Sequence, residues 1–207
     1  MTATERYLES QRGYRVSDNL IFAFGQDVAD AARDAVTLTT WAAEAHAAHV
    51  GVSIEAQPDD WLDTCEKTLA KLGWVMVERA WNTAHEVPDE TQEGAAKRIL
   101  KQALGEHPMT RGLIGKLQVA GEWPRRPRWA GLVEQDANGV PLLTSILLVA
   151  LPAELVELPT AAVPDAPPRH AFRLAIWAAR LNMAIFETAR PVLLRRFLEQ
   201  EEAGNRP

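Results

Sequence analysis

Two histidines have a spacing suited to metal binding. His46 and His49 lie three residues apart, with Glu44 just before them. On a helix this spacing puts two imidazoles on one face, and imidazole nitrogen is a common ligand of Zn²⁺. A third ligand, such as Glu55, would have to come from the following loop. The alternative is a polar helix end, where histidines complement the helix dipole. We favour this alternative because the sequence has no HExxH motif and no thiolate cluster.

A second group combines arginines with tryptophans. Trp123, Arg125, Arg126, Arg128 and Trp129 fall within the seven residues WPRRPRW. Guanidinium groups beside aromatic rings suit phosphate or single-stranded nucleic acid, through bidentate pairing and stacking. Alternatively, the arginines stack on the tryptophans or cross an acidic surface. The net charge of −6 argues against nucleic acid, double-stranded DNA above all, because phosphate binding needs positive charge. This segment therefore predicts contact with another protein.

Carboxylates gather at the start of a helix that we expect from Pro58. They are Asp59, Asp60, Asp63 and Glu66. Paired carboxylates can perform acid-base catalysis. Acidic residues are also favoured at a helix N-terminus, and Asp63 with Lys67 has the spacing of an i, i+4 ion pair. We interpret this group as a solvated helix face.

The sequence lacks the motifs of the commonest enzymes. It contains no GxxxxGK[ST], no GxSxG and no GxGxxG after a strand. Its single cysteine, Cys65, lies on the apolar stripe of the helix from Pro58, with no base at a readable spacing, so we expect a small core residue. No catalytic residue and no cofactor are predicted.

Composition and the two ends of the chain indicate one domain without an export signal. With 207 residues, 47% of them hydrophobic, the chain can bury a core of its own. Residues 1–17 are polar, lack the apolar region of a signal peptide and are expected to be loosely ordered. The longest apolar run, Val140–Leu151, is shorter than the ~20 residues of a transmembrane helix. We expect a cytoplasmic protein, or one exported without a Sec signal.

The stretch Trp129–Leu151 predicts a hairpin around which the fold is built. Asn138-Gly139 is a strong signal for a two-residue turn, which would pair Val133 with Thr144. Both faces of this hairpin carry apolar residues. Other elements are therefore expected to cover it on both sides.

The remaining pattern predicts an α+β fold. An alanine-rich helix from Asp27, as N-cap, to Val50 would pack on one sheet face through Ala35 and Ala42. Further helices are expected over 58–72, 91–104, 107–120 and 188–202. An antiparallel or mixed sheet would contain the hairpin and strands at 19–25, 74–81 and 172 onward. Residues 172–186 fit strand or helix, and we favour two strands with a turn near Ala179 and Arg180. The prolines within 159–168 predict an irregular loop.

Four segments together resemble a set of uncharacterised bacterial proteins of mixed α/β structure. These are NLIFAFGQDV, the alanine-rich helix, the tryptophan-led helix that ends in LGWV, and the DANGV hairpin. The resemblance implies a bacterial α/β protein and no particular function.

Three functions follow from these features, in order of preference. The first is a non-enzymatic interaction or assembly protein, which binds itself or another protein through an apolar, tryptophan-rich surface. The second is a lipid-engaging or toxin-like effector, associated with virulence, in which an apolar cavity accepts an acyl chain. The third is an enzyme whose motif we do not recognise.

Overall fold

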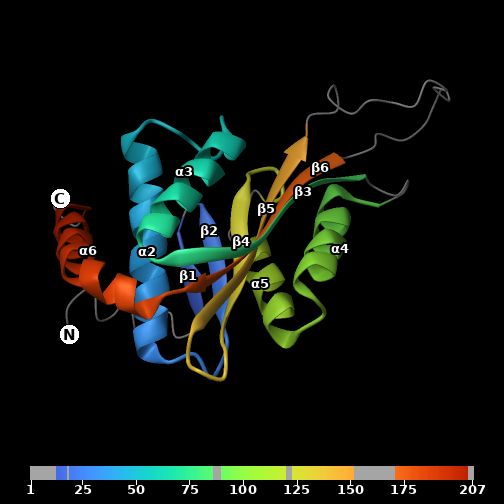
Figure 1. Cartoon of the computed structure of the whole chain (residues 1–207). Helices are drawn as coiled ribbons and strands as arrows, with labels where there is room; N and C mark the ends of the chain where they lie inside the picture. Colours follow the sequence, from blue (N-terminus) through green and yellow to red (C-terminus); the bar gives the residue numbers. More distant parts are fainter. Residues whose placement is uncertain (1–12, 18, 86–89, 120–122, 152–170, 205–207) are drawn as a thin grey trace, which may run out of the picture.

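The computed structural model describes residues 13–17, 19–85, 90–119, 123–151 and 171–204. Within these ranges the chain forms an α+β fold, with helices on both faces of one mixed sheet (Figure 1). The elements in chain order are β1 (Tyr14–Val16), β2 (Leu20–Phe24), α2 (Asp30–His49), α3 (Pro58–Lys71), β3 (Trp74–His85), α4 (Gln92–Leu104), α5 (Pro108–Val119), β4 (Arg128–Gln135), β5 (Pro141–Leu151), β6 (Ala171–Leu181) and α6 (Met183–Gly204). The predicted fold class is confirmed.

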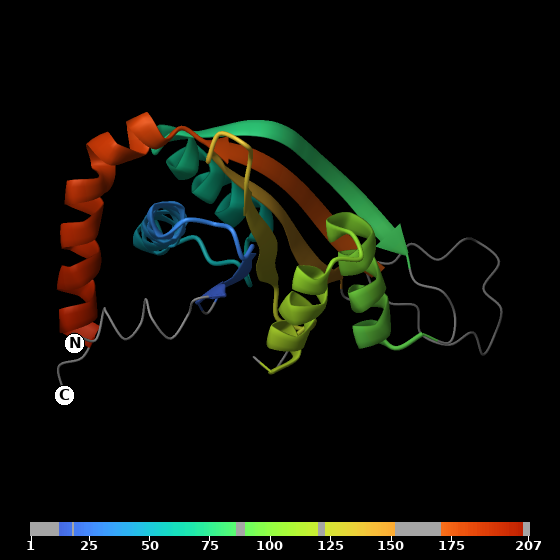
Figure 2. The same ribbon diagram turned by 90° about the horizontal axis from the view of Figure 1, so that it is seen from below.

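The sheet has the strand order β1-β2-β4-β5-β6-β3 in the described part of the chain. Strands β2 and β4 run parallel, and every other neighbouring pair is antiparallel. Among the described strands, β3 therefore forms one edge, where it pairs with β6 alone. Figure 2 shows β3 along the outer side of the curved sheet.

The central hairpin forms, but its register differs from the prediction by one residue. Val133 lies opposite Leu143, and not opposite Thr144. The loop contains three residues between Asp136 and Val140, whose backbone groups are joined by a hydrogen bond of 3.0 Å. Gly139 has a φ of 75° in this loop, as expected for a turn followed by a left-handed residue.

Asp136 explains why the longer loop forms. Its Oδ1 accepts hydrogen bonds from the backbone N–H groups of Asn138, at 2.9 Å, and Val140, at 3.0 Å. An aspartate that binds its own turn in this way is a common turn former. Pairing with β6 starts at Leu142, just beyond Pro141, as the missing N–H of proline predicts.

One core lies between the sheet and helices α2, α3 and α6. Trp129 is at its centre, fully buried, with edge-to-face contacts to Phe22, Trp61 and Trp177 at centroid distances of 5.1, 5.8 and 5.6 Å. Its indole N–H donates to Ser145 Oγ at 2.9 Å, so the buried polar atom is satisfied. Helix α2 contributes mostly small residues to this core.

A second core lies on the opposite face, between the sheet and helices α4 and α5. Ile146, Phe172 and Leu100 are fully buried there, and Trp123 is nearly so. The two cores together cover both faces of the hairpin. This confirms the expectation that elements would lie on both of its sides.

The ends of several elements correct the predictions. Helix α2 begins at Asp30 with Ala29 as its N-cap, so the predicted capping by Asp27 is wrong. Part of the N-terminal segment, predicted to be loosely ordered, forms strand β1. The prediction for 159–168 concerns residues outside the described ranges.

The interpretation of 172–186 as two strands is also wrong. Strand β6 runs without a turn to Leu181 because it pairs on both sides, with β5 and with β3. Asn182 then starts α6, where its Oδ1 accepts a hydrogen bond from the N–H of Ala184 at 3.1 Å. Pro191 lies inside α6.

In the described part of the chain, no helix is both long and apolar enough to span a bilayer.

Candidate functional site

The segment of arginines and tryptophans does not present its rings to solvent. Trp123 is 8% exposed and belongs to the core under α4 and α5, while Trp129 is fully buried in the core under α2 and α3. The segment therefore connects the two cores. Stacking on a base would require a ring face at the surface, and neither tryptophan offers one.

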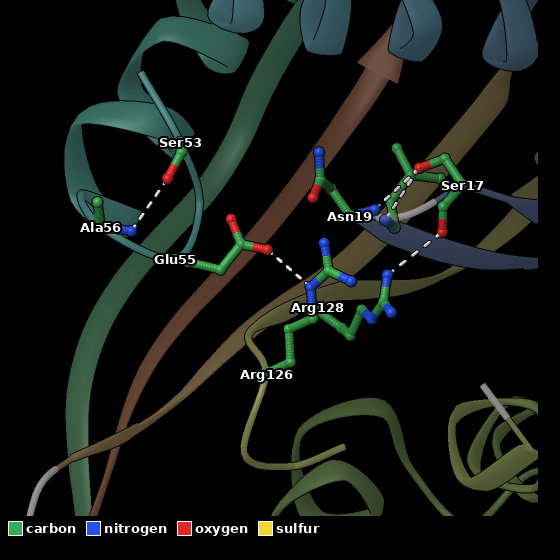
Figure 3. Close-up of polar contacts among 8 residues, drawn as sticks. Ser17, Asn19, Ser53, Glu55, Ala56, Arg126 and Arg128 are labelled. Carbon is green, nitrogen blue, oxygen red and sulfur yellow. Dashed lines mark hydrogen bonds and ion pairs between the residues drawn. The ribbon is translucent and has the colours of Figure 1, made fainter. Parts of the chain in front are cut away.

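The arginines of this segment form internal contacts (Figure 3). Arg126 Nε donates to Glu55 Oε1 at 2.7 Å. This hydrogen bond joins the loop after α2 to the segment just before β4. Burial raises the pKa of Glu55. Hydrogen bonds from Arg126 and other groups outweigh this effect and keep the pKa below its usual value. Arg128 is buried and its Nη1 lies 3.5 Å from the backbone oxygen of Ser17. Arg125 is exposed. The geometry indicates that Arg126 and Arg128 hold this region together.

The two histidines are placed together, and no third ligand joins them among the residues that the structure describes. His46 and His49 are exposed at the end of α2, where they line a surface pocket of about 520 Å³ between α2 and α6. Glu44 accepts a hydrogen bond from Ser17 Oγ at 2.6 Å, and Glu55 is engaged by Arg126. Among the described residues, no three histidines, cysteines or carboxylates are grouped to hold a metal ion.

One of the carboxylates near the start of α3 is buried, which corrects the interpretation as a solvated face. Glu66 is 7% exposed, and its Oε2 lies 3.1 Å from Arg79 Nη1. Burial raises the pKa of Glu66 more than the positive charge of Arg79 lowers it. The guanidinium of Arg79 also lies over the Trp81 ring, as does that of Arg173, which pairs with Asp59 at 2.6 Å. This network ties α3 to the outer two strands.

Cys65 is fully buried beside this network. Burial is the main cause that raises the pKa of its thiol, and the charges of Glu44 and Glu66 raise it further. A thiol must ionise to act as a nucleophile. The expectation of a core residue fits this position.

The exposed apolar side chains gather on one part of the surface. Seven large hydrophobic residues are exposed in the described part of the chain, and five of them lie on β3 or on the first half of α6. We call these five the β3–α6 surface: Val75, Met76, Val77, Ile185 and Val192. The other two are Val50 and Leu194. Scattered apolar residues need no explanation, but a contiguous patch indicates an interaction site.

The start of α6 lies against Gly73, the residue that precedes β3. Gly73, with a φ of 101°, precedes β3, and a Cβ added to it would lie 2.9 Å from Ile185 Cβ. Gly73 also accepts a backbone hydrogen bond from Asn182 at 2.8 Å. Val192 follows Ile185 by two helical turns, on the same flank of α6. The start of α6 thus lies beside the start of β3.

Strand β3 keeps this surface open because it is an edge strand. Its pairing with β6 shifts by one residue between Met76 and Glu78, which leaves Val77 as the extra residue of a β-bulge. Val75 and Val77 are 58% and 64% exposed. Sequence reasoning missed this surface because WVMV has the pattern of a strand that is buried on both faces. Nothing in this pattern distinguishes an edge strand from a central strand.

Most of the tryptophan surplus lies in the two cores. Five of the seven tryptophans are buried, which assigns them to core packing: Trp61, Trp74, Trp123, Trp129 and Trp177. The lipid-engaging alternative would place an acyl chain on the second apolar face of the hairpin or in a cavity behind it. That face is covered by α4 and α5.

Fold and site together define an α+β protein whose mixed sheet is covered on both faces and ends in an exposed apolar edge. No family model matches the chain, and neither does any curated protein or solved structure at a significant level. Its function is therefore inferred from its own residues.

Proposed function

We propose that this protein is a protein-binding module that docks a polypeptide on the β3–α6 surface. The observation that carries the proposal is the exposure of three successive apolar residues on an edge strand, beside a helix that exposes two more. Burial of apolar surface is favourable by about 25 cal/mol per Å², before the cost of association is subtracted. A partner that covers this surface would remove from water the largest group of exposed apolar residues described.

The edge of β3 adds polar groups to this apolar surface. The outer edge of an edge strand presents backbone N–H and C=O groups that have no neighbouring strand. An extended segment can bind such an edge by strand addition, with main-chain hydrogen bonds for affinity and side chains for specificity. The bulge at Val77 interrupts the regular edge. Side-chain contacts with Val75 and Ile185 therefore contribute alongside the main chain.

The charged clusters elsewhere support binding over catalysis. Glu66 and Arg79 are ion-paired with each other, and Arg126 is ion-paired with Glu55. These pairs join secondary-structure elements within the protein. Their positions fit a role in stability.

The test compares two substitutions of exposed valines by lysine. Val77→Lys places a charge on the β3–α6 surface, and Val50→Lys, at the end of α2, is the matched control. We expect wild-type protein to show a higher molar mass by light scattering, or a stoichiometric polypeptide after affinity purification from its native cells. Val77→Lys should lose this association and Val50→Lys should keep it.

Two outcomes would overturn the proposal. One is a strict monomer at high concentration that captures no polypeptide. The other is binding to lipid vesicles that Val77→Lys abolishes, since this would assign the surface to the lipid-engaging alternative.

A further inference from the structure

We propose that the pocket between helices α2 and α6 binds a small aromatic acid, with the ring of the ligand against Trp41 and its carboxylate at Arg196. The pocket has a volume of about 520 Å³. Small-molecule sites in proteins occupy about 300–1,000 Å³. The residues that line the pocket are distinct from the five of the β3–α6 surface, so this inference is independent of the proposed function.

The pocket lies where α2 and α6 pack against each other (Figure 1). The two helices meet through Trp41 and Phe197, whose rings are edge to face at a centroid distance of 5.4 Å. Beside this contact, α2 presents the small side chains of Ala42 and Ala45 to the pocket. Such short side chains leave space between the helices that longer ones would fill. The hollow thus follows from the alanine-rich sequence of α2.

Trp41 supplies an aromatic wall for the pocket. Its ring is half-buried, and its indole N–H has no hydrogen-bond acceptor in the described part of the chain. Trp81, which is also half-buried, is instead covered by the guanidinium groups of Arg79 and Arg173. Leu193 adds an apolar side chain to the same pocket. Aromatic rings gain from edge-to-face or offset contact beyond the burial of their area, so this wall favours an aromatic ligand.

The polar side chains of the pocket favour a negative charge on that ligand. Arg196 of α6 and both His46 and His49 of α2 line the pocket, and none of the three has a hydrogen-bond or ion-pair partner among the described residues. Glu199 also lines it, and its carboxylate lies 3.9 Å from Arg195 Nε. A guanidinium binds a carboxylate through two parallel hydrogen bonds, and an imidazole N–H can donate another. These donors together fit a carboxylate.

The end of α2 leaves these donors available. Carbonyl groups at the C-terminus of a helix lack intrahelical partners and compete for nearby donors. The carbonyls of His46, Ala47 and Ala48 already accept hydrogen bonds from the backbone N–H groups of residues 50–52. The imidazoles and the guanidinium are therefore free to bind a ligand.

Calorimetric titration with 1-naphthoate tests the class of ligand. We expect this aromatic carboxylate to bind at one saturable site per chain. Its neutral analogue 1-naphthalenemethanol and its cationic analogue 1-naphthylmethylamine keep the ring and change the charge. Each should bind about tenfold more weakly, because hydrogen bonds between charged groups are the stronger ones. Equal or tighter binding of either analogue overturns the inference, as does the absence of 1-naphthoate binding at millimolar concentration.

Two adjacent arginines of α6 provide a matched pair of variants. Both are exposed, but Arg196 lines the pocket and Arg195 does not. Arg196→Gln should raise the Kd of 1-naphthoate about tenfold and leave that of the neutral analogue unchanged. Arg195→Gln should keep the wild-type Kd for both compounds. An equal loss in the two variants indicates attraction by overall charge and overturns the assignment of the carboxylate to Arg196.

Two further variants test where the ring binds. Trp41→Leu should raise the Kd of 1-naphthoate and of its neutral analogue together, because both place the same ring on Trp41. Circular dichroism checks that this variant is folded, since Trp41 also contacts Phe197. Val77→Lys should leave 1-naphthoate binding unchanged. Loss of binding in Val77→Lys, with wild-type binding in Trp41→Leu, assigns the compound to the β3–α6 surface and overturns the inference.

Discussion

Arg79 Nη1 lies 3.1 Å from Glu66 Oε2 and joins the edge strand β3 to helix α3. The Glu66 side chain is 7% exposed and the Arg79 side chain 34% exposed, so the pair lies at the boundary between core and solvent. Removal from water opposes ionisation of Glu66 more strongly than Arg79 favours it. The pair therefore positions the strand against α3, while the net effect of its surroundings raises the pKa of Glu66.

This balance predicts a pH effect on stability. The pKa of Glu66 is raised in the folded protein. The contribution of Glu66 to the free energy of unfolding is therefore fully present below the usual pKa of 4.5, and it is lost as pH rises through the raised pKa. Glu66→Gln removes this loss of stability, because the amide of glutamine does not ionise. We expect the free energy of unfolding of Glu66→Gln, relative to wild type, to increase from pH 4 to pH 7 in urea titrations. A constant difference over this range would contradict the prediction.

Asp136 provides a control of the opposite sign. Hydrogen bonds from the backbone of Val140 and Asn138, with the charge of Arg180, lower its pKa below the usual 3.8. Its contribution is therefore present above that value and lost as pH falls through the lowered pKa. Asp136→Asn should be less stable than wild type at pH 7, and the difference should shrink in acid.

The buried hydrogen bond from Trp74 Nε1 to Thr39 Oγ1, at 3.0 Å, predicts a second effect. Thr39→Val keeps the shape of the side chain and leaves the buried indole N–H without an acceptor, at a cost of about 1–3 kcal/mol. Thr40→Val is the matched control, because Thr39 and Thr40 each donate to a helix carbonyl, and it is Thr39 that also accepts the hydrogen bond from Trp74. Thermal or urea unfolding should show the larger loss for Thr39→Val.

Gly131 predicts a third effect, in the middle of β4. A Cβ there would lie 2.8 Å from Ser145 Cβ and 2.9 Å from the backbone oxygen of Thr144. Gly131→Ala should therefore overpack the central strands and lower stability by about 1–3 kcal/mol. Gly115→Ala, in α5, meets no neighbouring atom within 4 Å and should raise stability by about 0.5–1 kcal/mol. Calorimetry that gives both variants the same sign would contradict this account.

The alanines of α2 predict a fourth effect and correct an expectation. Ala35 is fully buried, whereas Ala42 is half-buried at the side of the same core. Ala35→Leu should cost about 1–3 kcal/mol by overpacking. Ala42→Leu should cost less than Ala35→Leu, although the sequence pattern assigns both to the sheet face. Urea midpoints of the two variants decide between these assignments.

The sequence was sufficient for the elements whose signals are local. The alternation of apolar residues predicted the strands at 19–25 and 74–81, and Thr91, whose Oγ1 accepts from the N–H of Gly94, marked the start of α4. The two-sided apolar pattern of the hairpin predicted cover on both faces. These features depend on periodicity and capping, which neighbouring residues determine.

Features set by distant contacts could not be predicted. The register of the hairpin is an exception, because it depends on a local contact, the binding of Asp136 to its own turn, which the Asn-Gly signal masked; a shift of one residue moves every side chain of β5 to the other face. The burial of Glu66 depends on Arg79, which comes from another element. The edge position of β3 depends on the strand order, which the apolar pattern of WVMV does not specify.

The parallel pairing of β2 with β4 has a consequence for how the chain folds. Leu20 pairs with Trp129, more than half the chain length later, and Trp74 pairs with Leu181 at a similarly large separation. Contacts between such distant positions require a large loss of chain entropy before they add stability, which slows folding. During synthesis, β2 emerges long before its parallel neighbour and β3 long before β6. The fully apolar strand LIFAF must therefore stay out of aggregates until the second half of the chain leaves the ribosome.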